Sequence, residues 1–158
     1  MLKRKGVKHK LVVTGGGVKD YIMKVRTMCV ELGLGSEVVF TGSVAKEELV
    51  YLYNLADLFV YPSLYEGFGY PPLEAMACGC PVVASNVTSI PEVVGEAAVL
   101  IDPYDVEGMA NAIGRVLLDE QLRAELIKKG FKQVKKFSWE KTAKETLEVY
   151  KKVYDLKK

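Results

Sequence analysis

The sequence has no long hydrophobic run, little net charge and few cysteines. No apolar stretch reaches the ~18 consecutive residues that a membrane-spanning helix requires. The net charge is only +2 over 158 residues, which is too small to indicate a nucleic-acid partner by itself. The three cysteines are an odd number without the spacing of a disulfide framework, which favours a reducing compartment. We therefore expect a cytoplasmic globular protein that binds no nucleic acid.

The first ten residues, MLKRKGVKHK, are basic but do not read as a secretory signal. The apolar run that follows, residues 11–13, is too short for a signal-peptide core and leads directly into glycines. Five of the basic side chains form a cluster: Lys3, Arg4, Lys5, Lys8 and Lys10. The cluster could make peripheral contact with anionic lipid. A solvated helix end is the interpretation we favour.

Two of the cysteines, Cys78 and Cys80, form a C-x-C pair. A zinc site needs more ligands than this pair, and the chain offers no second pair and only one histidine, His9. We therefore expect no bound metal, and we expect these cysteines to pack as small hydrophobic residues.

Short apolar runs alternate with helical patterns along the whole chain, which is typical of βαβ units. The apolar runs lack polar alternation, as in strands that are buried on both faces of a parallel sheet. The pattern predicts one Rossmann-like α/β domain over residues 1–158, with a mostly parallel sheet of about five strands flanked by helices. The expected strands are residues 10–14, 37–41, 58–61, 81–84 and 98–101. The expected helices are residues 18–32, 46–55, 72–77, 105–118, 121–137 and 139–156.

Several residues suit the ends of these helices. Ser43 and Ser138 are expected to cap helix N-termini, and Gly33 and Gly35 are expected to end the first long helix. Residues 138–158 would then form a closing C-terminal helix.

Three glycines, Gly15-Gly16-Gly17, follow the first expected strand and precede a helix. Glycines in this position let the backbone approach a phosphate near the free N–H groups of a helix N-terminus. The dinucleotide fingerprint requires a sixth-position glycine, but Asp20 stands there, and no acidic residue ends the next strand. The pattern argues against NAD, and it leaves open a phosphate site or a plain tight turn.

A second glycine-rich loop begins with Glu66 and has the sequence EGFG over residues 66–69. Its glycines allow successive N–H groups to point at one anion or sugar oxygen. Two prolines then suit the first turn of a helix, which would also contain Glu74, where the helix dipole favours a carboxylate. Glu74 could equally accept hydrogen bonds from two adjacent hydroxyls, as in ribose. Both acids are expected at the sheet edge where open α/β folds bind ligands, although Glu66 could be a plain solvated loop residue.

A pair of carboxylates can also serve a glycosidase, with one carboxyl on either side of the scissile bond. Nothing in this sequence provides a second wall that would hold a sugar between Glu66 and Glu74. We consider this alternative the weaker one.

Six segments in succession carry a family resemblance over nearly the whole chain. They are LVVTGGG, VVFTGSV, ADLFVYPS, EGFGYPPLEAMACGCPVVAS, IPEVVGEAAVLIDPYD and FSWEKTA. Glu66 and Glu74 form an E-x7-E pair within the fourth segment. In order and spacing, the segments resemble the nucleotide-sugar-binding C-terminal half of retaining GT-B glycosyltransferases of the glycogen-synthase-like, group 1 type. The resemblance implies transfer of a hexosyl unit from a nucleotide diphosphate sugar to a sugar or lipid-linked acceptor, with no metal or other cofactor.

The resemblance also implies roles for individual residues. Glu66 would be the catalytic-site acid that contacts the donor sugar, and Glu74 would bind the ribose hydroxyls. The other expected donor contacts are made largely by backbone: Gly67, Phe68 and Gly69 to the sugar and diphosphate, Gly15 and Gly16 near the phosphates, and Thr41, Gly42 and Val44 around the base.

This sequence does not contain two parts of the family pattern. One is the strand that carries a Gly-Arg pair and then a lysine, and the other is the N-terminal acceptor domain. We therefore expect this domain or a partner chain to complete the enzyme, and the isolated chain to be inactive. We also expect a gap, a substitute strand or a swapped dimer at the edge formed by residues 10–14. A non-catalytic nucleotide-sugar-binding subunit and a fragment of a GT-B nucleotide-sugar epimerase are the alternatives.

Overall fold

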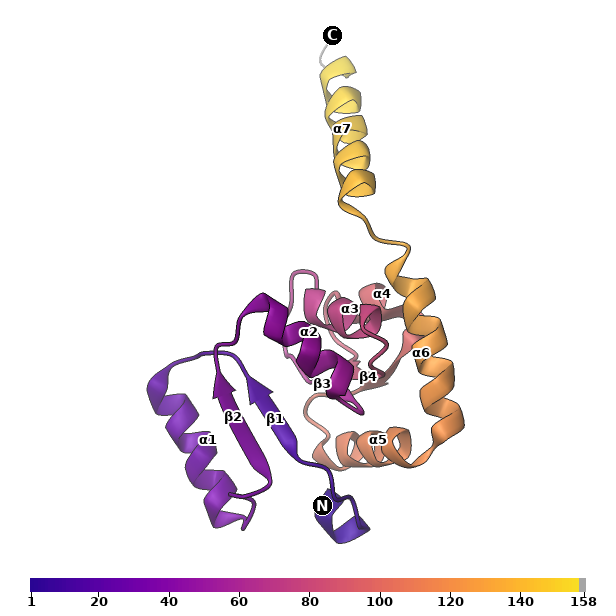
Figure 1. Cartoon of the computed structure of the whole chain (residues 1–158). Helices are drawn as coiled ribbons and strands as arrows, with labels where there is room; N and C mark the ends of the chain where they lie inside the picture. The colour runs from indigo at the N-terminus through magenta and orange to yellow at the C-terminus, as the bar shows by residue number, and fades with distance from the viewer. Residues whose placement is uncertain (157–158) are drawn as a thin grey trace. The chain divides into compact units, whose positions relative to one another are not determined.

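The computed structural model describes residues 1–156, and for Arg4 and Lys5 it describes the backbone alone (Figure 1). The side chains of these two members of the basic cluster therefore lie outside the description. The chain divides into two compact units, the first from Met1 to Leu55 and the second from Ala56 onward. The single domain expected over residues 1–158 stays a prediction.

The first unit contains a two-stranded parallel sheet and its helices. Its elements are the 3-10 helix η1 (Leu2–Lys5), β1 (Leu11–Thr14), α1 (Lys19–Glu31), β2 (Val38–Gly42) and α2 (Lys46–Leu55). Leu11 pairs with Val38, and the register shifts between Val13 and Thr14. The helix α1 ends as expected, because Gly33 adopts a left-handed φ of +67° just beyond it.

The second unit contains a three-stranded parallel sheet in the order β3-β4-β5. Its strands are β3 (Phe59–Tyr61), β4 (Val82–Ser85) and β5 (Ala98–Ile101). Its helices are α3 (Tyr70–Ala77), α4 (Ile90–Val94), the 3-10 helix η2 (Gly95–Ala97), α5 (Val106–Leu118), α6 (Glu120–Val134) and α7 (Trp139–Asp155).

The α/β class and the parallel strands are confirmed. The expectation of one continuous sheet is wrong for the described residues, because the five strands form two separate sheets. The gap, substitute strand or swapped dimer expected at the edge formed by residues 10–14 stays a prediction. The short elements α4 and η2 were not predicted, since each is too brief to show a helical repeat.

The core of the second unit is built around β4, whose four residues are all fully buried. Val83 of β4 and Ile101 of β5 pack with Val116 of α5 and Leu126 of α6. The helices α3 and α4 also contact β4. The unbroken apolar run of β4 is thus explained, because both of its faces are covered by protein.

The helices α3 and α6 pack closely at Gly130. A Cβ atom added to Gly130 would lie 3.2 Å from Cβ of Met76, which is fully buried on α3. The absence of a side chain at Gly130 therefore sets the distance between the two helices. This contact fixes α3 and hence the loop that leads into it.

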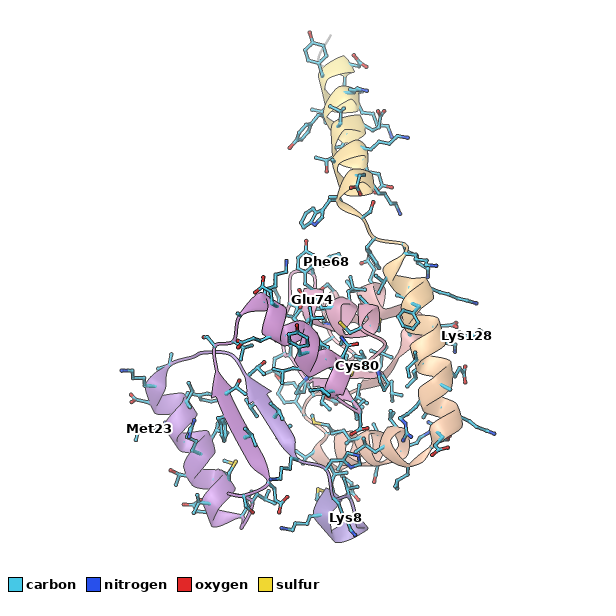
Figure 2. The ribbon with its side chains drawn as sticks, viewed as in Figure 1. Lys8, Met23, Phe68, Glu74, Cys80 and Lys128 are labelled. Atoms are coloured by element: carbon cyan, nitrogen blue, oxygen red, sulfur yellow. The ribbon has the colours of Figure 1, made fainter. Side chains whose placement is uncertain are left out.

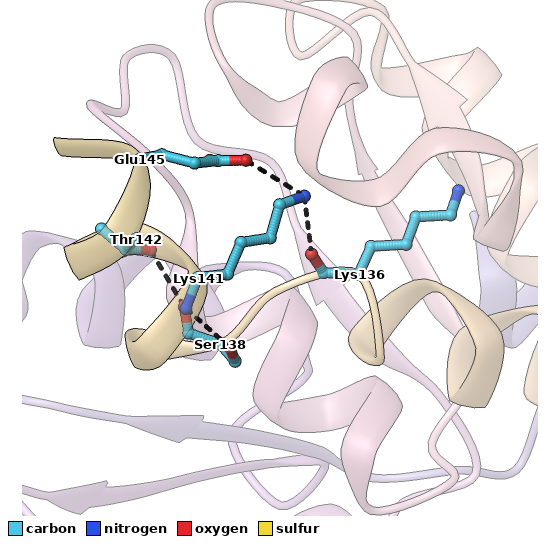
Figure 3. A network of polar contacts seen from close by, with 5 residues as sticks. All are labelled: Lys136, Ser138, Lys141, Thr142 and Glu145. Atoms are coloured by element: carbon cyan, nitrogen blue, oxygen red, sulfur yellow. Dashed lines mark hydrogen bonds and ion pairs between the residues drawn. The ribbon is translucent and has the colours of Figure 1, made fainter. Parts of the chain in front are cut away.

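A polar network marks the junction between α6 and α7 (Figure 3). Ser138 caps α7 as expected, because its Oγ accepts a hydrogen bond of 3.1 Å from the Lys141 N–H. The Lys141 ammonium also donates to the Lys136 carbonyl oxygen at 3.4 Å and lies 3.9 Å from Glu145.

Ser43, by contrast, does not cap α2 as expected. That helix begins at Lys46, and the Glu48 carboxylate accepts a hydrogen bond from the Ala45 N–H at 2.8 Å.

Within residues 1–156, no helix is long and apolar enough to cross a bilayer. The described cysteines Cys29, Cys78 and Cys80 are free thiols. Cys80 is buried as expected, whereas Cys78 and Cys29 are partly exposed.

Candidate functional site

The carboxylate of Glu66 is held by two hydroxyl groups that precede it in the chain. The Tyr61 hydroxyl at the end of β3 donates to Glu66 Oε1 at 2.5 Å, and the Ser63 hydroxyl donates to the same oxygen at 2.9 Å. Glu66 is half-buried. Because both donors meet one oxygen, the carboxylate has a fixed orientation, unlike a plain solvated loop acid.

The backbone around Glu66 is anchored by the residues just before α4. The Glu66 N–H donates to Thr88 Oγ1 at 3.2 Å. The Ser89 hydroxyl lies 3.0 Å from the carbonyl oxygen of Glu66 and 2.9 Å from that of Phe68. Thr88 has a φ of +54°, the only left-handed non-glycine backbone among the described residues. Such conformations persist where the surroundings determine them, often beside functional sites. No pattern in the sequence indicates a role for Thr88 or Ser89.

Only one of the two loop glycines needs to be glycine for its backbone. Gly69 is the N-cap of α3 with a φ of +104°, and an added Cβ would lie 2.6 Å from Cδ1 of the buried Ile90. Gly67 has no left-handed φ, and an added Cβ would meet open space. The predicted backbone freedom is thus used at Gly69 alone.

Aromatic contacts hold the side chain of Phe68 between the two glycines. Its ring lies 4.8 Å from that of Tyr70 and makes an edge-to-face contact with Phe137 at 5.7 Å. No described residue accepts a hydrogen bond from the N–H groups of Gly67, Phe68 or Gly69. Three successive N–H donors thus lie beside the anchored carboxylate and ahead of a helix N-terminus.

Glu74 lies on α3 and is exposed (Figure 2). The two prolines lie in the first turn of α3 as expected, but the helix begins at Tyr70. Glu74 is therefore in the second turn, and its expected first-turn position is wrong. Since the dipole effect falls off within the first turn, a helix-end role no longer explains Glu74. Burial raises the pKa of the Cys78 thiol, and the negative charge of Glu74, one helical turn earlier, raises it further.

In the first unit, the ends of β1 and β2 bring four of the expected binding residues together. The Gly15 N–H donates to the Gly42 carbonyl oxygen at 2.8 Å, and the Thr41 hydroxyl donates to the same oxygen at 2.9 Å. A Cβ atom added to Gly16 would lie 3.2 Å from Oγ of Ser43. The Gly15 amide is thus already used inside the unit.

Val44 follows these turns and is half-buried. The roles of Gly15, Gly16, Thr41, Gly42 and Val44 in binding a nucleotide stay predictions. Among residues 1–156, no group of three or more His, Cys, Asp or Glu side chains is arranged to hold a metal ion.

The sequence is similar to several glycosyltransferases. It is 51% identical over 112 residues to O-antigen chain mannosyltransferase B of Escherichia coli, a match that covers 71% of this chain and 29% of the relative. It is 38% identical over 147 residues to D-inositol 3-phosphate glycosyltransferase of Acidothermus cellulolyticus, covering 90% of this chain and 33% of that protein.

The fold is similar to solved glycosyltransferase structures. Sucrose-phosphate synthase of Thermosynechococcus elongatus superposes with a TM-score of 0.82 at 34% identity, covering 93% of this chain and 39% of that one. The Anabaena protein HepE, solved in a complex with UDP, gives a TM-score of 0.82 at 25% identity, covering 91% and 41% of the two chains. This chain thus spans well under half of the length of each of these four proteins.

The family model for group 1 glycosyl transferases matches residues 1–133. This match covers the strands, the glycine-rich turns and the E-x7-E pair, and the parallel α/β architecture agrees with it. The chain belongs to the group 1 glycosyltransferase family.

Proposed function

We propose that this chain is the donor-binding part of a retaining glycosyltransferase. It binds a nucleotide diphosphate sugar, and the hexosyl unit passes to a sugar or lipid-linked acceptor held by a further domain or a partner chain. The mannosyltransferase relative supports a hexosyl donor, and the HepE complex with UDP supports a nucleotide diphosphate as its carrier.

The observation that carries this proposal is the anchored carboxylate of Glu66 beside the N–H groups of residues 67–69. A carboxylate accepts hydrogen bonds from sugar hydroxyls, and only one of its oxygens is engaged here. Successive backbone N–H groups ahead of a helix N-terminus suit a diphosphate. The loop thus presents an acceptor for the sugar next to donors for the diphosphate.

This arrangement also favours the departure of the diphosphate. Breaking the bond between sugar and diphosphate places negative charge on the leaving oxygen. The N–H groups of Gly67, Phe68 and Gly69 are fixed by the anchors of the loop and by the turn at Gly69. Preorganised donors of this kind stabilise developing charge in the transition state. Glu74, one helical turn away from the loop, is assigned to the ribose hydroxyls.

Calorimetry on the purified chain tests the proposal. UDP, GDP and ADP are titrated beside their glucose and mannose conjugates. We expect binding of at least one nucleotide diphosphate and its sugar conjugate, and no sugar transfer by the chain without its further domain or partner. Absence of binding across the panel would overturn the proposal, and so would robust transfer by the chain alone.

A further inference from the structure

Two residues outside the expected site hold the Glu66 side chain. Tyr61 and Ser63 both donate hydrogen bonds to Oε1 of Glu66, at 2.5 and 2.9 Å. The Tyr61 ring stacks on Phe59 of the same strand, with centroids 5.8 Å apart. This packing holds the ring, and with it the hydroxyl group, in place. Both residues are half-buried.

The two oxygens of Glu66 are therefore not equivalent. Each carboxylate oxygen offers about two lone-pair sites, and both sites of Oε1 are occupied by protein hydroxyls. No described residue pairs with Oε2. The backbone of Glu66 is held as well, because its N–H donates to Thr88 and its carbonyl oxygen accepts from Ser89.

We propose that Tyr61 and Ser63 are positioning residues of the donor site, which hold Oε1 so that Oε2 receives the hydroxyls of the donor sugar. The inference rests on the proposed function, because it assigns a sugar to Glu66. A carboxylate held in advance loses less rotational freedom when the sugar arrives, and its geometry is set before binding. Removing either hydroxyl should therefore weaken binding of the sugar part of the donor only, because neither hydroxyl is assigned to the nucleotide.

The test compares hydroxyl-deleting variants of the chain, Tyr61→Phe and Ser63→Ala, with matched controls. Tyr61→Phe keeps the ring that stacks on Phe59. Ser63→Thr keeps a hydroxyl at the same position. Tyr65→Phe removes a hydroxyl from a tyrosine of the same loop that is 81% exposed. Each variant is titrated with the bare nucleotide diphosphate and with its sugar conjugate, and its folding is checked by thermal melting.

We expect Tyr61→Phe and Ser63→Ala each to weaken binding of the nucleotide sugar about three- to tenfold, because a carboxylate that is no longer held in advance must be ordered when the sugar binds. Binding of the bare nucleotide diphosphate should not change, and Tyr65→Phe and Ser63→Thr should behave as the unaltered chain. In a Glu66→Ala background, the two changes should have no further effect on the nucleotide sugar, because their common partner is gone.

The outcomes separate this inference from the proposed function. If the unaltered chain binds no nucleotide sugar, the proposed function fails and the inference fails with it. If the unaltered chain binds but Tyr61→Phe and Ser63→Ala leave nucleotide-sugar affinity unchanged, the inference alone fails. It fails also if both ligands weaken equally, or if the losses persist without Glu66, because either result indicates a purely structural role.

Discussion

The side-chain amide of Gln133 on α6 donates a hydrogen bond to the carbonyl oxygen of Val93 on α4, 2.7 Å away. Both residues are buried, and Oε1 of Gln133 accepts from the Lys136 ammonium at 2.7 Å. Gly95 lies so close that an added Cβ would be 3.1 Å from the amide. The bond ties α6 to the helix whose N-cap, Ser89, anchors the Glu66 loop.

Replacing Gln133 by leucine should therefore destabilise the protein. The change keeps the side-chain volume but leaves the buried Val93 carbonyl without its donor, which costs about 1–3 kcal/mol. Urea unfolding measures the difference. Gln121→Leu is the matched control, because Gln121 is exposed at the start of the same helix. Equal unfolding free energies for the two variants would show that the bond contributes nothing.

The two loop glycines should differ sharply when each is replaced by alanine. Gly69→Ala forces a side chain into a left-handed φ of +104° and against Ile90, which should lower the unfolding free energy by about 1–3 kcal/mol. Gly67→Ala meets open space and should change it by less than about 0.5 kcal/mol. Thermal and urea unfolding of both variants provide the check. A stable Gly69→Ala variant would contradict the structure at the start of α3.

Cys80 should resist alkylation in the folded protein. Burial raises the pKa of the Cys80 thiol from 9.0 to about 12, with a smaller contribution from the neighbouring Cys78. At pH 8 the reactive thiolate is then a fraction of roughly one in ten thousand. Iodoacetamide labelling followed by peptide mass spectrometry should show slow reaction of Cys80 in the folded state and rapid reaction in urea. Equally fast labelling in both states would contradict its burial.

The same shift in pKa sets a dependence of stability on pH. The folded state binds the Cys80 proton more tightly than the unfolded state does. The contribution of this thiol to the free energy of unfolding is therefore complete below pH 9.0. This contribution is lost as the pH rises from 9.0 towards 12. As the pH rises above 9.0, the free energy of unfolding should therefore fall less for Cys80→Ala than for the unaltered chain. Parallel losses in urea unfolding at increasing pH would contradict the assignment.

Local sequence signals predicted most of the secondary structure of this chain. The run of residues 98–101 is β5 as expected, and Ser138 caps α7, because these features depend on neighbours in the sequence. The helix α3 begins two residues before its expected start, since prolines are accepted throughout a first helical turn. The division of the strands into two sheets depends on pairing between distant segments, which runs of apolar residues do not specify.

The candidate site shows the same limit. The sequence drew attention to Glu66 and the EGFG loop because glycines and acids at a strand-to-helix turn are a local pattern. It did not indicate what holds Glu66. Thr88 and Ser89 lie 22 and 23 residues further along the chain, and ordinary hydroxyl residues carry no signal of such a contact. Tyr61 and Ser63 are close in sequence, but their shared use of one oxygen depends on how the loop turns.

The division of roles between Glu66 and Glu74 is the central claim, and paired titrations test it most directly. Glu66→Ala and Glu74→Ala are each titrated with a nucleotide diphosphate and with its sugar conjugate, with folding verified by thermal melting. Losing a hydrogen bond to a charged acceptor costs about 1.5–3 kcal/mol. We predict that Glu74→Ala weakens both ligands by this amount, whereas Glu66→Ala weakens only the sugar conjugate. Equal losses for both ligands in both variants would contradict the division of roles, and unchanged binding in both would contradict the site itself.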